Sequence, residues 1–245
     1  MRRTLAVAAR VVSQLLNSPR FLALSIMAPL LIIYLLKLFF DTFPPGFGSD
    51  RFAIPAAAFI VHFLSFLLCA IALVQERTGG TLERMFVNGF RRTEIIGGYL
   101  IGYLGLATFQ AVVALAEVIW LFGLDYERSV LATLFAVIWL LAIASVMLGI
   151  FISTFARHEG QVLPFVPLII LPSVFLSGFL VDVEKLPGWA EAVGHAFPML
   201  YANNVIQEMI VPSPVRESAW GNFAILAGYA VALLLLASMT LREAD

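Results

Sequence analysis

The residues of this sequence that could perform chemistry do not complete any catalytic pattern. His158 is followed by Glu159, as in the helix of a zinc protease, but the second histidine of that motif would stand at position 162, which is Val162. The only lysines, Lys37 and Lys185, are each followed by leucine, whereas a nucleotide-binding P-loop needs lysine followed by serine or threonine. No Gly-x-Ser-x-Gly turn occurs. We therefore expect no enzyme, no cofactor and no metal site on this chain.

Lipid, rather than water, is the solvent that the composition indicates. The 245 residues are 61% hydrophobic and 13% charged, whereas a soluble domain carries roughly 25% charged residues. The net charge of −1 provides no basic surface for nucleic acid. The sequence therefore predicts an integral membrane protein.

Six apolar segments are long enough to cross a bilayer, which takes about 20 helical residues each. They cover residues 21–40, 52–74, 95–122, 130–155, 162–181 and 221–241. We predict an all-α protein in which residues 1–245 form a single transmembrane domain with six transmembrane helices.

The first residues predict an amphipathic helix that lies in the membrane surface before the first span. A helix over residues 4–16 has a polar face with Arg10 and Gln14. Its opposite, apolar face is predicted to hold Leu5, Ala8, Val12 and Leu15.

The distribution of basic residues predicts the orientation, because short loops rich in arginine and lysine remain in the cytoplasm. With the N-terminus inside, ten basic residues fall on the cytoplasmic side and four on the outer side. The outer four are Arg51, Arg128, Lys185 and Arg216. We expect a multi-pass protein of the cell membrane with both termini in the cytoplasm, a cytoplasmic loop at 75–94 and an external segment at 182–220.

The cytoplasmic loop predicts one short amphipathic helix outside the membrane. Thr81 is a favourable N-cap, and Leu82, Met85 and Phe86 follow at spacings that make a small apolar face. Gly89 is a plausible left-handed stop. Two interpretations remain open: the helix rests on lipid headgroups, or it docks on a protein partner through apolar anchors and ionic pairs.

The external segment is amphipathic and is divided by prolines. Pro187 and Pro198 break it into pieces, and Trp189 and Tyr201 suit a membrane interface. The pair Ser177-Gly178 is expected to end the fifth span early. We predict re-entrant helices that form an outer gate, and the alternative is an ordinary interfacial loop.

Two ionisable residues lie inside the predicted spans. Lys37 and Glu117 both fall near the outer ends of their spans, so an ion pair is one hypothesis. The alternatives are a lysine that extends to the headgroups and a glutamate at the interface.

Other residues of the spans predict packing or contact with a transported compound. Gln110 is expected to form an interhelical hydrogen bond, and Gly98 and Gly102 to allow another helix to approach closely. An aromatic stripe on one side of the second span favours contact with an amphipathic cargo, or with lipid. It consists of Phe59, His62, Phe63 and Phe66.

Two motif-bearing patches make the sequence resemble the membrane subunits of type-2 ATP-binding-cassette exporters. The first patch comprises Glu76-Arg77, residues 80–85 and residues 91–97. The second comprises residues 175–179, 183–189, Phe197-Pro198 and Tyr201. The resemblance covers essentially the whole chain. The sequence departs from the family's pattern at Asn88-Gly89, where a proline is common, and at Tyr99, where a lysine is common.

The resemblance implies how such a chain works. Residues 77–92 would be a coupling helix on a separate ATPase subunit, which would carry ATP and magnesium. The coupling residues would be Glu76, Arg77, Thr81, Leu82, Glu83, Arg84, Met85 and Phe86. Two copies of the chain would form the path, with the second and fifth spans beside it, so Phe175 joins the candidate cargo residues.

The function that this resemblance implies is ATP-driven export of a hydrophobic or amphipathic compound. Export of a lipid-linked glycan is the first alternative. A stand-alone channel or secondary transporter is an alternative of another class, which predicts charged relays in the middle of the spans.

Overall fold

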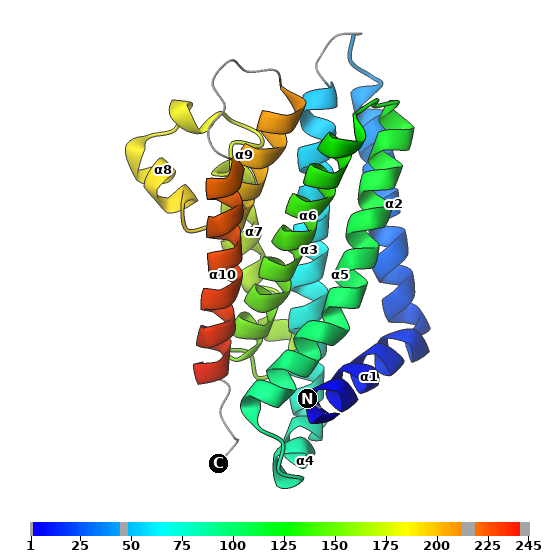
Figure 1. Cartoon of the computed structure of the whole chain (residues 1–245), viewed down its shortest axis with the longest axis vertical. Helices are drawn as coiled ribbons and strands as arrows, with labels where there is room; N and C mark the ends of the chain where they lie inside the picture. The colour runs from blue at the N-terminus through cyan, green and yellow to red at the C-terminus, as the bar shows by residue number, and fades with distance from the viewer. Residues whose placement is uncertain (1, 45–48, 212–218, 241–245) are drawn as a thin grey trace.

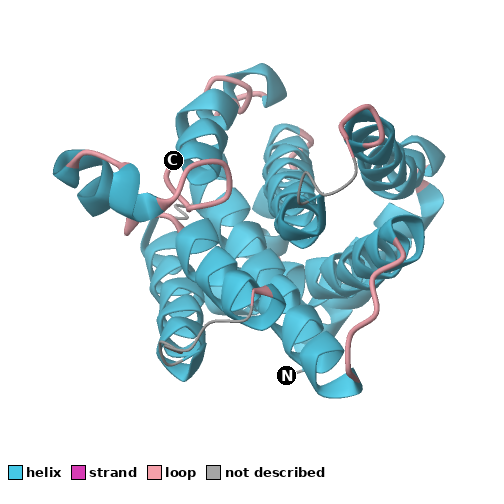
Figure 2. Ribbon diagram, turned by 90° about the horizontal axis from the view of Figure 1, so that it is seen from above, coloured by secondary structure: helices cyan, strands magenta, loops and turns pink. Residues whose placement is uncertain are grey.

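Helices are the only regular secondary structure in the part of the chain that the computed structural model describes, which is residues 2–44, 49–211 and 219–240 (Figures 1 and 2). The elements are α1 (Arg2–Asn17), α2 (Pro19–Phe40), α3 (Ser49–Thr78), α4 (Thr81–Val87), α5 (Arg92–Phe122), α6 (Arg128–Ser153), η1 (Glu159–Gln161), α7 (Phe165–Phe175), η2 (Val183–Lys185), α8 (Gly188–Gly194), α9 (Pro198–Ile210) and α10 (Ala219–Thr240). Arg216, Arg242 and part of the predicted external segment lie outside the described residues.

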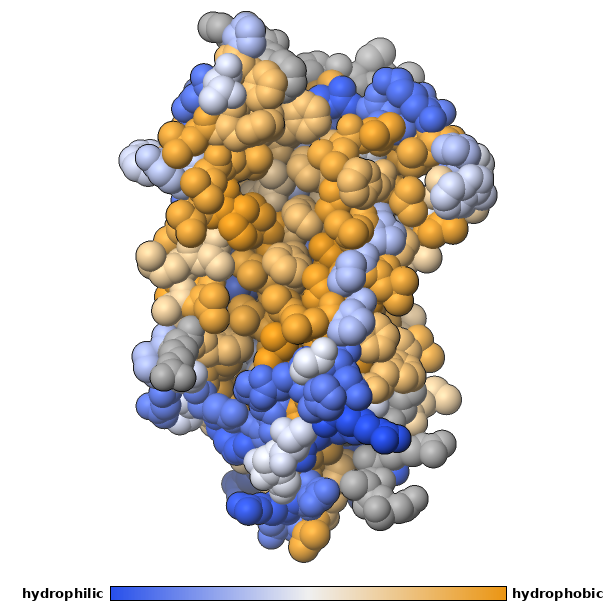
Figure 3. All heavy atoms as spheres, turned by 180° about the vertical axis from the view of Figure 1, so that it is seen from behind, coloured by the Kyte–Doolittle hydropathy of each residue, from blue (hydrophilic) through white to orange (hydrophobic). Residues whose placement is uncertain are grey.

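Five of the described helices are long and apolar enough to cross a membrane. They are α2, α3, α5, α6 and α10, and each overlaps one of the predicted spans. Figure 3 shows the same property as a broad apolar band, with polar residues gathered towards the two ends of the molecule. The all-helical class and the membrane location are therefore confirmed.

The fifth predicted span, 162–181, does not form one long helix. Its only α-helix is α7, with 11 residues, which is about 16 Å long and half of the hydrocarbon thickness. The helix ends at Phe175, and the chain turns at Gly178, whose φ is +76°. The apolar run from Phe179 to Val181 continues beyond the helix, which is why hydropathy alone overestimates its length.

The long helices run between two ends of the molecule, and the short helices lie at these ends. Figure 1 shows α1, α4 and the last turns of α10 at one end and α8 and α9 at the other, with α9 beside the upper half of α10. Figure 2 shows the short segment around α8 projecting from the side of the bundle. Below, the first end is called the α4 end and the second the α9 end.

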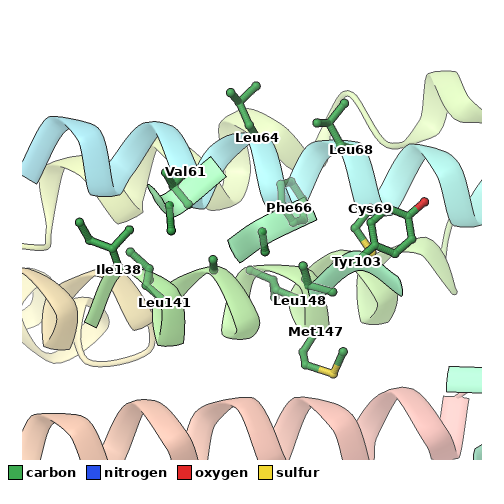
Figure 4. Close-up of a cluster of buried hydrophobic side chains, with 14 of the residues drawn as sticks. Val61, Leu64, Phe66, Leu68, Cys69, Tyr103, Ile138, Leu141, Met147 and Leu148 are labelled. Carbon is green, nitrogen blue, oxygen red and sulfur yellow. The ribbon is translucent and has the colours of Figure 1, made fainter. Parts of the chain in front are cut away.

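The two central helices, α3 and α6, pack closely because small residues lie between them. A Cβ at Gly149 would lie 2.7 Å from the carbonyl oxygen of Phe66, so only glycine permits this approach. Figure 4 shows Phe66 of α3 pointing towards α6, where Leu141 and Leu148 lie, while Met147 points towards α10.

Buried polar groups join the spans at mid-depth. Gln110 of α5 accepts a hydrogen bond from Ser65 Oγ of α3 at 3.1 Å and donates to the carbonyl of Ser25 in α2 at 3.2 Å. His62 Nδ1 lies 2.6 Å from Ser145 Oγ of α6. The interhelical hydrogen bond predicted for Gln110 is confirmed, and it ties three helices together.

Candidate functional site

The tip of the α4 end is a short helix bounded by two glycines. Gly80 precedes α4 with φ +67° and Gly89 follows it with φ +75°, and both conformations favour glycine. The helix is thus shorter than the predicted 77–92, because Arg77 belongs to the last turn of α3 and Arg92 begins α5. Thr81 is the first residue of α4 rather than its cap, since the N-cap position is taken by Gly80.

The exposed face of α4 differs from the predicted one. Leu82 and Met85 are 4% and 8% exposed and pack against the rest of the chain, and Phe86 is half-buried. Glu83 and Arg84 are exposed, and Val87 is 87% exposed. Val87 is therefore the exposed apolar side chain of α4, and the apolar spacing alone did not predict it because that spacing marks the buried side of the helix.

Helix α1 supports α4 and the end of α3 through a partly buried ion pair. Arg10 lies 2.6 Å from the carboxylate of Glu76, whose residue is 4% exposed. The same guanidinium lies 3.7 Å from Met85 Sδ in α4. One arginine of α1 thus holds both α3 and α4.

A second arginine of α1 holds the chain after α4. Arg3 donates a hydrogen bond to the carbonyl of Gly89, lies 4.0 Å from the Glu94 carboxylate and sits over the Phe90 ring at 5.5 Å from its centroid. The sequence pattern places Arg10 on the polar face of an amphipathic helix, but it does not predict the contacts that Arg3 and Arg10 make with the chain around α4.

Helix α1 lies against α5 at the α4 end of the molecule (Figure 1), where it packs onto two glycines of α5. A Cβ at Gly98 would lie 2.4 Å from Val7 Cβ, and a Cβ at Gly102 would lie 2.6 Å from Val11 Cγ1. The predicted close approach at these glycines is confirmed, and the approaching helix is α1.

Some apolar residues of α1 face the protein and others are exposed on its outer side. The prediction of one apolar face that includes both Leu5 and Leu15 is therefore wrong. The protein-facing residues are Val7, Ala8, Val11 and Leu15. Leu5, Val12 and Leu16 are exposed, a location that suits a helix in the membrane surface.

Two residues predicted to contact a partner form interactions within the chain. The carboxylate of Glu76 forms an ion pair with Arg10. Arg77 donates to the carbonyls of Ser153 at 2.7 Å and Ala156 at 3.2 Å, where α6 leaves its last carbonyls without helical partners. These residues fix the base from which α4 projects.

The candidate cargo residues of α3 separate into buried and accessible ones. His62 and Phe66 are fully buried against neighbouring helices, so they are not accessible to a cargo in this structure. Between Ala53 and Val74 the only residues that are not buried recur at every fourth position. They are Phe59, Phe63, Leu67 and Ile71.

This accessible stripe is extended at the α9 end by a further aromatic ring. Phe59 stacks with Phe63, and Phe179 stacks with Phe59, both at 6.4 Å between ring centroids. Phe175, at the end of α7, is 51% exposed. Phe179 belongs to residues 175–179 of the second patch, but the sequence pattern did not predict it among the candidate cargo residues.

The predicted outer-gate residues lie around the turn that follows α7. Ser177 is buried, and its carbonyl accepts a hydrogen bond from Asn203 Nδ2 of α9 at 2.9 Å. Tyr201 donates to the carbonyl of His195 at 2.9 Å. Pro187 precedes α8, Pro198 begins α9, and Trp189 is 71% exposed.

The structure does not bring Lys37 and Glu117 together. Lys37 forms an ion pair with Asp41, one turn along the chain, and lies 5.6 Å from the centroid of the Phe122 ring. The buried Oε2 of Glu117 has no hydrogen-bond partner among the described residues. Lys37 pairs with Asp41 because that carboxylate lies one turn away on the same helix end. Similar depth in the membrane was therefore not enough to predict a pair with Glu117.

Comparison with known proteins gives a consistent family. The model of the family described as ABC-2 type transporter matches residues 2–211. The chain is 24% identical over 179 residues to the probable multidrug ABC transporter permease YbhR of Escherichia coli, covering 73% of this chain and 48% of the relative. It is 22% identical over 187 residues to the linearmycin resistance permease protein LnrN of Bacillus subtilis, covering 76% and 48%.

A eukaryotic relative is similar over a comparable region. The chain is 25% identical over 197 residues to the ABC transporter G family member 20 of Dictyostelium discoideum, covering 79% of this chain and 27% of the relative. The chain thus spans about half, or less, of the length of these curated relatives.

Proposed function

This chain belongs to the ABC-2 type transporter family, and we propose that it is the membrane subunit of an ATP-driven exporter of hydrophobic or amphipathic compounds. The observation that carries the proposal is the exposed face of α4, which lies at the end of the bundle (Figure 1) and is held to α1 through the contact of Arg10 with Met85.

The ATPase is a separate subunit that docks on α4. Glu83, Arg84 and Val87 offer it two charges that set register and one apolar anchor at the tip. A movement of α4 reaches the spans directly, because α4 is joined through Met85 to Arg10, and through Arg10 to Glu76 of α3. The α4 end is then cytoplasmic, as the excess of basic residues there also favours.

Two copies of the chain form the transport path. The stripe of Phe59, Phe63, Leu67 and Ile71 is the accessible side of an otherwise buried helix, and its apolar character suits a drug-like or lipid-like compound. Helices α8 and α9 dip into the outer leaflet above this path, where irregular backbone is tolerated if protein or water covers it.

Replacing Phe63 with alanine is expected to weaken the response to cargo. The chain is purified with its ATPase partner, placed in vesicles, and hydrolysis is measured while compounds are screened for stimulation. The half-maximal concentration of a stimulating compound should rise about fivefold in Phe63→Ala, corresponding to ~1 kcal/mol for one aromatic contact.

The control for this experiment is Phe109→Ala, which removes an exposed aromatic ring from α5. It should leave the half-maximal concentration unchanged. An equal rise in both variants would show that the stripe on α3 has no special role in cargo binding.

A further inference from the structure

A cleft of about 570 Å³ opens at the α9 end of the molecule. It lies between the start of α3, the segment after α7, helix α9 and the start of α10, and nine of its twelve lining residues are polar or charged. Its size is typical of a small-ligand site, but its polar lining contrasts with the apolar stripe on α3.

The two cations in the cleft share one carboxylate. Arg51 and Lys185 both form ion pairs with Asp182, and their hydrogen bonds hold the pKa of Asp182 below its usual value. Glu184 and Glu208 also line the cleft, and neither forms an ion pair within residues 2–44, 49–211 and 219–240. Among the lining residues carboxylates therefore outnumber cations by one, and two of the three have no ion-pair partner in the part of the chain that the structure describes.

The cleft also contains a buried amide whose oxygen is unsatisfied. Asn203 is 1% exposed, and its Nδ2 donates to the Ser177 carbonyl, while its Oδ1 has no hydrogen-bond partner among the described residues. Asn204, Gln207 and Asn222 add further amide groups to the lining. A buried acceptor without a donor is unfavourable, so a ligand that donates hydrogen bonds is favoured here.

We propose that this cleft binds a primary-amine group, with the ammonium against Glu208 and Glu184. An ammonium carries three donors and no acceptor, which complements the carboxylates of Glu184 and Glu208 and the amide oxygen of Asn203. No cluster of three or more His, Cys, Asp or Glu that could hold a metal occurs in the described part of the chain. The amine can come from the headgroup of a membrane lipid or from a transported compound, and the second source rests on the proposed function.

The test uses the purified chain in nanodiscs of phosphatidylglycerol, without an ATPase partner. A hexadecylamine that carries a photoactivated diazirine is crosslinked to the protein, and the labelled peptides are mapped by mass spectrometry. The amine probe should label the peptide around Glu208 about tenfold more than the matching hexadecanol probe does. A factor of about ten is the size expected for a charge-assisted hydrogen bond. Glu208→Gln should lose most of this difference and Glu184→Gln a smaller part of it.

Glu191→Gln is the matched control, because Glu191 is an exposed carboxylate of α8 that does not line the cleft. It should label like the unaltered chain. Competition by phosphatidylethanolamine, but not by phosphatidylcholine, would identify a lipid headgroup as the source, and no competition would identify a free amine. Equal labelling by the alcohol probe, or full labelling of Glu208→Gln, would overturn the proposal. Because no step of the assay involves ATP, failure here is distinct from failure of the exporter function.

Discussion

Reversing the charge of Glu83 to arginine should reduce ATP-driven transport by about tenfold or more, while the protein still inserts and folds. Glu83 is exposed on α4 and has no ion-pair partner in the described part of the chain, so the substitution costs the free subunit little. At a docked interface the new arginine would lie against the basic group that Glu83 pairs with, and such a juxtaposition of like charges costs several kcal/mol. Transport into vesicles and hydrolysis by the ATPase partner are measured together, and transport should fall while basal hydrolysis persists.

Val87→Asp tests the same face through its apolar anchor. Val87 is 87% exposed, and a central anchor of an interface typically contributes about 2 kcal/mol or more. The control for both α4 variants is Glu191→Arg, which makes the same charge reversal as Glu83→Arg but at an exposed residue of α8. Wild-type transport by both α4 variants, or equal loss in the control, would contradict the coupling role.

Gly98→Ala should destabilise the α4 end although it adds a single carbon. The new Cβ would lie 2.4 Å from Val7 Cβ and 2.9 Å from the Thr4 carbonyl oxygen, so α1 must move away from α5. Overpacking of this kind costs about 1–3 kcal/mol. Since α1 carries Arg3 and Arg10, its displacement should also weaken the ion pair with Glu76 and lower the coupling of hydrolysis to transport.

The control for this prediction lies on the same helix. A Cβ at Gly105 meets nothing within 4 Å, so Gly105→Ala should be neutral or stabilising by up to about 1 kcal/mol, as alanine favours helix over glycine. The midpoint of thermal unfolding and the ratio of transport to hydrolysis are measured for both variants. Equal behaviour of the two variants would mean that α1 is not seated in α5 as described.

The features that the sequence predicts best are those with a local physical cause. Long apolar runs predict the five long helices, because a span must satisfy its own backbone and expose apolar side chains. Gly89 predicts the end of α4, and Gly98 and Gly102 predict a close helix contact, because these roles depend on the absence of a side chain.

The features that sequence reasoning missed depend on contacts between distant residues. Arg10 reaches Glu76 only after α1 folds back onto α5, and nothing near Arg10 in the sequence indicates this. Leu82 and Met85 of α4 pack within the chain instead of facing outward, because an apolar face predicts burial but does not identify the residues that bury it. Lys37 was assigned to Glu117 by depth, while Asp41 lay one turn away on the chain.

The central claim, that α4 is the docking site for an ATPase subunit, is tested most directly by site-specific crosslinking. A photoreactive amino acid replaces Val87 at the tip of α4 or Trp189 of α8, which is 71% exposed at the opposite end. The assembled transporter is irradiated in membranes, and crosslinked pairs are identified by mass spectrometry. The predicted result is a crosslink to the ATPase subunit from position 87 and none from position 189. Absence of that crosslink at position 87 in an assembly that hydrolyses ATP, or its appearance at position 189, would contradict the account.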